Sequence, residues 1–500
     1  MSYSAVRKLM PELSIRQKQT HNIVMITFWS QFSVYALNTI LILFLTRSQF
    51  MHGLGYSQTK AYAFIGTSQA MGYLMPLLGG FMADNILGIR RAIFLGSFML
   101  AFAYLLVMLS GFTLTSHGDQ LFIAAYALIP VTNSLLMGTA SSLISRIYVD
   151  DAVQAKASMT FYYMSINVGA LLATIVAPSL MDSPYGPLSV LAIAFVGKSI
   201  AALNFAYRRT LYENVIWGKD ATKLSQKGWY QLIAYIAGIY TLTLIAYSQV
   251  YLASIVISIG CGLGLLWFLV KTIRLSGEKR KKQLIALLLI FEAVVFFVIY
   301  NQMNSTLVLF AASNSNLNLF GLTVNPAHYQ LLNPLLIIIL GLQLPKFYRK
   351  FPKFIIPYQF ACGTLLAGGA LMLMAIGSIF AVNGMVNGNF IAITYVMITL
   401  AELWVSAIGL SMIGLYCDGR TIAFAMGVWY ISQSLSNVIS GRLASFVAIP
   451  NDMTNAMAKL AIYEGYYWKM GLVTCVVGAV MLIVAVWLKK HFSKGEMVLV

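Results

Sequence analysis

The feature that most constrains this chain is a succession of apolar segments, each long enough to cross a lipid bilayer. A membrane-spanning helix needs about 20 predominantly apolar residues. Only 10% of the 500 residues are charged, whereas about a quarter are charged in a typical soluble domain. The sequence therefore predicts an all-α polytopic membrane protein. Its fourteen expected spans are residues 23–46, 60–83, 91–112, 121–145, 158–180, 188–207, 229–248, 250–270, 283–303, 329–345, 354–378, 390–416, 422–448 and 467–488.

Basic residues are distributed unevenly over the loops that would join these segments. The chain contains 33 Lys and Arg against 15 Asp and Glu, which gives a net charge of +18. If the N-terminus lies in the cytoplasm, most Lys and Arg, including the run from Lys271 to Lys282, fall in cytoplasmic loops, as the positive-inside rule requires. Topology therefore explains the charge. We expect both termini in the cytoplasm and no binding to nucleic acid.

The cysteines and histidines do not indicate metal or redox chemistry. The four cysteines, Cys261, Cys362, Cys417 and Cys475, lie in or beside apolar segments and form no C-x-x-C pair. The five histidines lie at span ends, in loops or in the C-terminal tail, and no nucleophile with a base or glycine-rich phosphate loop is evident. We therefore expect no enzyme activity, no catalytic residue, no metal and no cofactor.

Two acidic residues fall near the centre of expected spans. Glu402 lies in the middle of residues 390–416, and Glu292 lies about ten residues into residues 283–303. A charge at the centre of a bilayer costs several kcal/mol, so such residues usually face a cavity and mark a transport or proton path. The alternative for each acid is a carboxyl group that holds helices together. Both interpretations remain open from the residues alone.

The loop after the second expected span contains five residues at a characteristic spacing: Gly80, Asp84, Gly88, Arg90 and Arg91. A small residue at the first position lets two helices approach, the aspartate can accept hydrogen bonds at a helix end, and the arginines hold the loop at the cytoplasmic surface. The pattern resembles the G-x-x-x-D-x-x-x-G-x-R-R loop of the major facilitator superfamily. The resemblance implies two six-helix bundles that rock about a midplane site. We expect these bundles at residues 1–210 and 283–500, with two additional helices in residues 211–282.

A second resemblance is more specific. The segment FYYMSINVGAL, residues 161–171, resembles the fifth-helix signature F-Y-x-x-I-N-x-G of the proton-coupled oligopeptide transporters. Further matches follow in family order: Phe291 to Gln302, Asn325-Pro to Asn333-Pro, Ala401 to Leu410, and Met426 to Trp429. The sequence is identified as a member of this family, in its bacterial form with two extra helices, and the resemblance implies a location in the bacterial inner membrane.

The resemblance implies that the ammonium group of a peptide binds Asn167, Asn333 and Glu402. An ammonium group has three hydrogen-bond donors, which two amide oxygens and one carboxylate can satisfy. The other expected substrate contacts are Tyr35, Gln31, Tyr163, Ser406 and Trp429. Glu402 and Glu292 are the candidates for proton coupling.

The first expected helix departs from the family pattern E-x-x-E-R-F-x-Y-Y. Thr27, Ser30 and Gln31 stand where relatives have two acids and an arginine, and Met137 stands at the position of a fourth-helix lysine. A peptide carboxylate in this half of the cavity would lack its cationic partners, at a cost of several kcal/mol. We therefore expect ligands whose carboxylate is amidated, esterified or absent to be tolerated or preferred.

Lys198 is an unusual basic residue midway along the sixth expected span. It could replace the missing positive charge, pair with an acid, or extend its stem toward a membrane interface. These three interpretations remain open.

The sequence as a whole predicts a secondary active transporter. It would import di- or tripeptides, or peptide-like amine-bearing solutes, by alternating access. Proton symport is implied by the resemblance. The alternatives are an uncoupled amine facilitator or exporter, and a non-transporting membrane receptor or scaffold. The expected partners are a small-molecule substrate and the lipid bilayer, and we expect a monomer.

Overall fold

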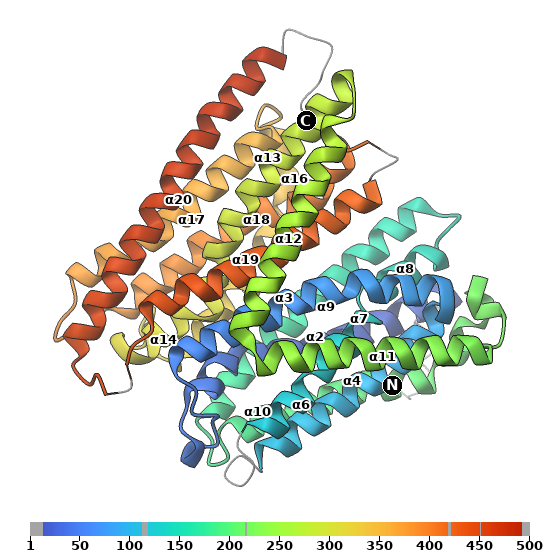
Figure 1. The fold of residues 1–500 in the computed structure, drawn as a ribbon, viewed down its shortest axis with the longest axis horizontal. Helices are drawn as coiled ribbons and strands as arrows, with labels where there is room; N and C mark the ends of the chain where they lie inside the picture. Colours follow the sequence, from blue (N-terminus) through green and yellow to red (C-terminus); the bar gives the residue numbers. More distant parts are fainter. Residues whose placement is uncertain (1–13, 113–118, 216–217, 419–421, 451, 493–500) are drawn as a thin grey trace, which may run out of the picture.

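The computed structural model describes five stretches of the chain: residues 14–112, 119–215, 218–418, 422–450 and 452–492. Nearly all of these residues are helical. The helices form two bundles, and two further helices, α11 (Gln226–Ser248) and α12 (Val250–Ile273), lie along the outside of the first and the second bundle respectively (Figure 1). One two-stranded sheet is present in the described chain, where β1 (Asn318–Leu319) pairs antiparallel with β2 (Leu322–Thr323). The predicted all-α architecture is therefore confirmed.

The first bundle contains the helices α2 (Ile15–Thr46), α3 (Gln58–Met82), α4 (Ile89–Gly111), α6 (Gln120–Tyr126), α7 (Leu128–Ser134), α8 (Thr139–Ile147), α9 (Ala152–Met181) and α10 (Pro187–Tyr207). Its short helices are η1 (Gln49–Met51), η2 (Ala83–Leu87), η3 (Arg209–Val215) and η4 (Gly218–Ala221). The fourth expected span is divided into α6, α7 and α8. The break before α8 falls at Gly138, whose φ of +85° ends a regular helix.

Along the chain, α11 and α12 separate the two bundles. The second bundle contains α13 (Gly277–Tyr300), α14 (Thr306–Asn314), α15 (Leu332–Gly341), α16 (Leu344–Lys350), α17 (Ile356–Ile379), α18 (Gly388–Tyr416), α19 (Ile422–Ala444) and α20 (Ala456–Phe492), with short helices η5 (Asn301–Asn304), η6 (Pro326–Leu331) and η7 (Ser445–Val447). Thus η5 interrupts the helical path between α13 and α14, whereas η6 leads directly into α15.

Side-chain caps fix where the long helices begin. The Ser14 hydroxyl accepts a hydrogen bond from the backbone amide of Gln17, and the Gln17 side chain accepts one from the backbone amide of Ser14. This reciprocal pair is a capping box at the start of α2. The Asp151 carboxylate similarly accepts from the backbone amide of Gln154 and begins α9. These caps satisfy amide groups that have no partner within the helix.

The number of spans differs from the expected fourteen. Within the described residues, eleven helical stretches are long and apolar enough to span a membrane, and η6–α15 with α16, bent by 52°, can form a twelfth. The other two expected spans are α3 and α19, which have 25 and 23 residues and are not among these apolar stretches. Polar and small residues interrupt the apolar runs of both helices, so their composition resembles that of an interface more than that of a lipid-facing surface.

These two helices pack directly on each other across the boundary between the bundles. A Cβ atom added to Gly66 would lie 2.8 Å from the carbonyl oxygen of Asn437. One added to Gly441 would lie 2.6 Å from the carbonyl oxygen of Tyr62. Because no side chain separates the two backbones there, α3 and α19 approach as closely as small residues allow.

The two bundles meet at one end and diverge toward the other, where α2 begins and α20 ends (Figure 1). Hydrogen bonds that join the bundles connect Gln330 to Thr39 (2.8 Å), Ile449 to Gln58 (2.9 Å), Asn325 to Asp182 (3.0 Å) and Ser434 to Ala70 (3.1 Å). The molecule is therefore closed between the bundles at the end that carries the β1–β2 turn and open toward the end that carries α16.

The loop before α4 is held by a residue that the sequence did not single out. The carboxylate of Asp220, on η4, accepts a hydrogen bond from the backbone amide of Arg90 at 3.2 Å. It also lies 3.9 Å from the guanidinium group of Arg146. Gly88 has a φ of +82°, and a Cβ atom there would overlap the Asp220 carboxylate. Asp220 therefore provides the acid at the N-terminal end of α4.

The other residues of the loop pattern have different surroundings. Asp84 is exposed, whereas the Arg91 side chain donates to the backbone carbonyl of Thr222 at 2.7 Å. A Cβ atom on Gly80 would meet no atom within 4 Å, so the close approach expected at Gly80 does not occur there. It occurs one residue earlier, because a Cβ atom on Gly79 would overlap the backbone of Ser134.

Candidate functional site: a cavity between the bundles

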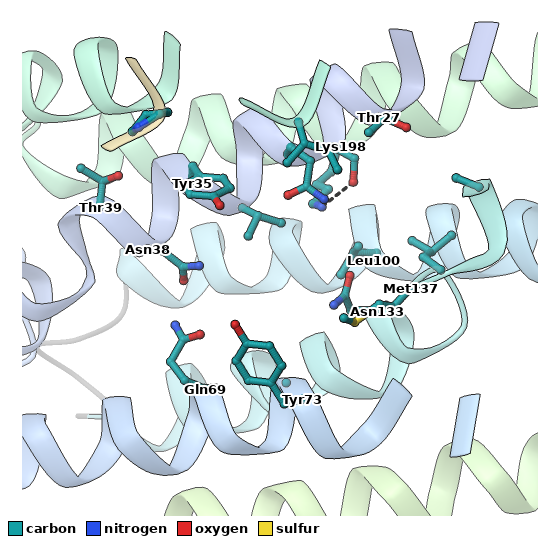
Figure 2. Close-up of a pocket in the computed structure, with 18 of the residues that line it drawn as sticks. Thr27, Tyr35, Asn38, Thr39, Gln69, Tyr73, Leu100, Asn133, Met137 and Lys198 are labelled. Carbon is teal, nitrogen blue, oxygen red and sulfur yellow. Dashed lines mark hydrogen bonds between the residues drawn. The ribbon is translucent and has the colours of Figure 1, made fainter. Parts of the chain in front are cut away.

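A cavity of about 480 Å³ lies between the two bundles. Its volume is within the range of about 300–1,000 Å³ that is usual for small-molecule sites. Figure 2 shows Tyr35, Asn38, Gln69 and Tyr73 directed toward the same space from α2 and α3. The carboxamide side chains among the described lining residues are Gln31, Asn38, Gln69, Asn133, Asn301, Asn304, Gln330, Asn333 and Asn437. This lining offers many donors and acceptors without formal charge.

One face of α2 forms much of the wall of the first bundle. Thr27, Ser30, Gln31 and Tyr35 line the cavity, at spacings of three and four residues that place them on one side of a helix. The α9 helix lies beside this face, because Gly169 brings the backbones of α2 and α9 together. A Cβ atom on Gly169 would lie 2.6 Å from the carbonyl oxygen of Phe28. Gln31 and Tyr35 are therefore placed where a bound molecule would touch them.

Glu402 lies behind the wall of the second bundle. Asn333, in the first turn of α15, lines the cavity and donates to the Glu402 carboxylate at 2.6 Å. The same amide nitrogen donates to the Thr399 hydroxyl at 3.2 Å. Glu402 is half-buried and is not among the described residues that line the cavity. The two predicted residues are therefore in direct contact, with the amide in front of the acid.

Phenol groups surround Glu402. Tyr300 is a hydrogen-bonding neighbour of the carboxylate. Tyr35, Tyr73 and Tyr163 lie within electrostatic reach of it. Among the described residues, no Lys or Arg forms an ion pair with Glu402. Hydroxyl and amide groups thus take the place that a cation would occupy in an ordinary ion pair, which leaves the negative charge available.

Asn167 lies on α9, which packs against α15. It is 6% exposed, and its amide nitrogen donates to the backbone carbonyl of Tyr163 at 3.0 Å. The Tyr163 side chain is half exposed, and its phenol group, rather than the Asn167 amide, lies within electrostatic reach of Glu402. Asn167 therefore lies on a helix next to the one that carries Asn333, and neither Asn167 nor Tyr163 is among the described residues that line the cavity.

Comparisons with known proteins agree on one family. The sequence profile of the POT family matches residues 90–460. The dipeptide and tripeptide permease A of Chromobacterium violaceum is 31% identical over 478 residues, which cover 95% of this chain and 94% of that protein. The permease of the same name from Proteus mirabilis is 32% identical over 476 residues, 93% of each chain. The chain belongs to the POT family.

Solved structures of POT family members have the same fold. Tetrameric PepTSo2 superposes with a TM-score of 0.84 at 25% identity, over 95% of this chain and 99% of that chain. A structure from work on substrate recognition in proton-dependent oligopeptide transporters superposes with a TM-score of 0.79 at 25% identity, over 94% and 98% of the two chains. The expected major facilitator fold is confirmed. As a POT family member, the chain is a multi-pass membrane transporter and not an enzyme.

Trp429 and Ser406 are not placed with the other expected contacts of this POT family member. Trp429 is 1% exposed, and its ring packs edge-on against Phe297 and Phe360 in the second bundle. A Cβ atom on Gly409 would overlap the indole ring. Trp429 fills that gap between helices, so it lies outside the described cavity lining. Ser406 is half-buried on α18, one turn beyond Glu402, and is also outside that lining.

Glu292 lies inside the second bundle rather than at the cavity. It is 2% exposed on α13, and neither of its carboxylate oxygens has a hydrogen-bond partner among the described residues. The hydroxyl of Thr364, on α17, is its neighbour and also has no assigned partner there. Burying an ionised carboxylate without partners costs several kcal/mol. Glu292 therefore differs from Glu402 in two respects. It lies inside the second bundle, and its carboxylate has no hydrogen-bond partner among the described residues.

Lys198 is the main addition to the expected site. It lines the cavity, although it belongs to α10, and its ammonium group donates to the Ser30 hydroxyl at 2.8 Å (Figure 2). Its side chain is 2% exposed, so it does not extend to a membrane interface. Among the described residues it forms no ion pair with an acid. Two of the three interpretations that the sequence left open are thereby removed.

Proposed function

We propose that this POT family member imports di- or tripeptides, or peptide-like solutes with a free amine. The observation that carries the proposal is the contact between Asn333 and Glu402 at the wall of an amide-rich cavity between two bundles. The relatives named dipeptide and tripeptide permease A support the substrate class, since they align with nearly the whole chain.

The amine of the substrate would bind at the Glu402 end of the cavity. The amide nitrogens of Asn333 and Asn167 are both used within the protein, by Glu402 and Thr399 in one case and by the Tyr163 carbonyl in the other. Their carbonyl oxygens therefore remain as acceptors for an ammonium group. Together with the Glu402 carboxylate they would satisfy its three donors. Tyr35, Gln31 and Tyr163 would contact the rest of the molecule, and Ser406 and Trp429 would support α18.

Transport would proceed by alternating access of two bundles, at residues 1–210 and 283–500, around a linker at residues 211–282. The divergence of the bundles where α2 begins and α20 ends supports this arrangement (Figure 1). We place that open end in the cytoplasm of a bacterial inner membrane, because the connections at that end carry most of the Lys and Arg. One chain would contain the complete path, so a monomer would suffice. Four of the Lys and Arg that the sequence places in cytoplasmic segments lie outside the described residues: Arg7, Lys8, Arg420 and Lys494.

Proton coupling would involve Glu402, Glu292 or both. The absence of a basic partner for Glu402 among the described residues supports its role, because a proton and the substrate ammonium would then compete for one carboxylate. Glu292 would need a rearrangement of the second bundle to exchange a proton, since it is buried in this conformation. An exchange of protons at Glu402 alone is the simpler scheme.

Counterflow in liposomes tests the proposal. Purified protein is reconstituted in vesicles loaded with unlabelled dialanine, and entry of labelled dialanine is measured. We expect accumulation of label in loaded vesicles and none when the internal compound is N-acetyl-dialanine, which has no ammonium group. Equal accumulation with both compounds would overturn the amine site, and no accumulation with either would overturn peptide import.

A further inference from the structure

The half of the cavity that faces the first bundle lacks the charges expected of it. Thr27, Ser30, Gln31 and Met137 all line the cavity, and all four are neutral. They come from α2 and from the segment before α8. These four residues therefore provide no positive charge for an anion.

Lys198 brings a positive charge to that same part of the wall. It is the one residue with a formal charge among the described residues that line the cavity. Its ammonium group lies 2.8 Å from the Ser30 hydroxyl and 5.2 Å from the centre of the Tyr104 ring. Figure 2 shows Lys198 on the side of the cavity where Leu100 and Met137 also lie. The charge is thus located where two of the four neutral replacements, Ser30 and Met137, face the cavity.

The packing of α10 on α2 explains how a residue of an outer helix reaches the cavity. A Cβ atom on Gly197 would overlap the Ser33 hydroxyl and would lie 3.2 Å from the carbonyl oxygen of Trp29. The backbone of α10 therefore lies directly against α2 at this point. A long side chain at the next position, Lys198, passes beside α2 and ends at Ser30. A larger residue at Gly197 would move Lys198 away from the cavity.

The hydrogen bonds of Lys198 are incomplete. An ammonium group has three donors, and the hydrogen bond to Ser30 uses one of them. The face of Tyr104 can stabilise a cation but is not a full charge partner. Burial of a cation without an anionic partner is costly, and neither a carboxylate nor an exposed surface is present to balance it among the described residues. A bound anion at the cavity side would supply the missing partner.

We propose that Lys198 binds the carboxylate of the transported molecule, in place of the cationic residues that the first helix and the fourth helix lack. The identity of the ligand as a peptide rests on the proposed function above. The site then selects a molecule with an ammonium group at the Glu402 end and a carboxylate at the Lys198 end. This assignment reverses the expectation from the sequence that amidated ligands are preferred.

The wild-type protein alone provides the first test. Affinities of dialanine and of its C-terminal amide are measured by titration of the full-length protein in detergent. We expect dialanine to bind more tightly by on the order of 10- to 100-fold, the effect of one hydrogen bond to a charged group. Equal affinity, or tighter binding of the amide, would overturn the proposal.

Variants assign the preference to Lys198. Lys198→Met, which replaces the charge by an unbranched neutral side chain, should bring the two affinities within about 3-fold of each other, a difference below 1 kcal/mol. Lys198→Arg should keep most of the preference, because it keeps the charge. Lys60→Met is the matched control, since Lys60 belongs to the same bundle but pairs with Asp119 outside the cavity lining. A Lys198→Met protein that keeps the wild-type ratio would contradict the proposal.

A small inorganic anion separates failure of this proposal from failure of the proposed function. If wild type binds neither dialanine nor its amide, the proposal of peptide import is wrong. The anion site at Lys198 is then tested separately by adding sulfate at constant ionic strength. A ligand that binds the folded state raises the melting temperature. Sulfate should raise the melting temperature of wild type and of Lys60→Met more than that of Lys198→Met. Lys198→Arg should respond as wild type does. The same response in wild type and Lys198→Met would overturn the site.

Discussion

The two walls of the cavity hold their charges in different ways. On the wall of the second bundle, Glu402 lies behind Asn333, and phenol groups lie around it. On the opposite wall, Lys198 belongs to the lining itself and donates to a single hydroxyl, that of Ser30. The protein therefore solvates its acid with its own donors but leaves its cation with few acceptors. The acidic end is therefore organised before binding, whereas the basic end is completed by what binds.

Another lysine of the first bundle, Lys60, has an acidic partner, which Lys198 lacks among the described residues. Lys60 lies 2.7 Å from the Asp119 carboxylate, which also accepts a hydrogen bond from Tyr56 at 2.5 Å. This cluster lies outside the described cavity lining. The contrast between Lys60 and Lys198 is therefore a contrast between a structural ion pair and an open binding group.

The largest expected effect concerns the acidic wall. Glu402→Gln keeps the shape of the side chain and removes the charge, so the affinity for dialanine should fall by about 1.5–3 kcal/mol. Glu292→Gln is the matched control, because it changes an acid that lies outside the described lining, and it should leave the affinity unchanged. Titration of both variants checks the comparison. Wild-type affinity in Glu402→Gln would mean that the amine binds elsewhere.

The next largest effect concerns the packing of α10 on α2, which places Lys198 in the cavity wall of the first bundle. Gly197→Ala introduces a methyl group that overlaps Ser33, so the protein should lose about 1–3 kcal/mol of stability and part of its preference for the free acid. Gly260→Ala, on α12, has no atom within 4 Å of the new methyl group and serves as the control. Melting temperatures and the ratio of acid to amide affinity measure both outcomes. A stable Gly197→Ala protein with unchanged preference would separate Lys198 from the packing of α10.

A smaller effect is expected when the amides of the acidic wall are removed. Asn333→Ala should weaken dialanine binding by about 1 kcal/mol, since it deletes one neutral acceptor for the ammonium group. Asn167→Ala should cost no more than this, because Asn167 lies one helix further from Glu402. Titration of the two variants beside Glu402→Gln gives the order. An Asn167→Ala loss larger than that of Glu402→Gln would shift the amine from α18 toward α9.

The smallest effect concerns the paired lysine of the first bundle. Burial opposes ionisation of Asp119, but hydrogen bonds from Lys60 and Tyr56 outweigh it and hold the pKa of Asp119 below its usual value. A lowered carboxyl pKa gives stability that is present above the unfolded-state pKa of about 3.9 and is lost as the pH falls through the folded-state pKa. Acidification below about pH 4 should therefore lower the melting temperature of wild type more than that of Asp119→Asn. Because the pair is partly exposed, the difference should stay below about 1 kcal/mol. Parallel curves for the two proteins would remove Asp119 as a source of stability.

Motifs within single helices allowed several positions to be anticipated. The resemblance to the family assigns Asn333 and Glu402, from two separate segments, to one site, and the structure brings them into contact. Gln31 and Tyr35 line the cavity because helical spacing alone places them on one face of α2. Such residues depend on local periodicity and on short signatures, which a sequence displays directly.

Positions that depend on the relative placement of helices could not be anticipated in the same way. Lys198 reaches the cavity because Gly197 lets α10 lie against α2, and the sequence does not state which helix that glycine meets. Trp429 is turned into the core because Gly409, on another helix, leaves room for its ring. Asp220 holds the loop before α4 from a distant linker segment. Each of these contacts joins residues whose meeting is decided by packing.

The contact of α3 with α19 at Gly66 and Gly441 has a mechanical consequence. Two backbones that touch without interlocking side chains can roll on each other, so this contact can act as a fulcrum for the two bundles. From Gly66 to the end of α3 at Met82 the helix forms a lever arm of about 24 Å, at a rise of about 1.5 Å per residue. A tilt of about 10° at the fulcrum would move the tip of that arm by roughly 4 Å, with the rise per residue as above. A small rotation at two glycines is thus enough to change the width of the opening at the far end of the molecule.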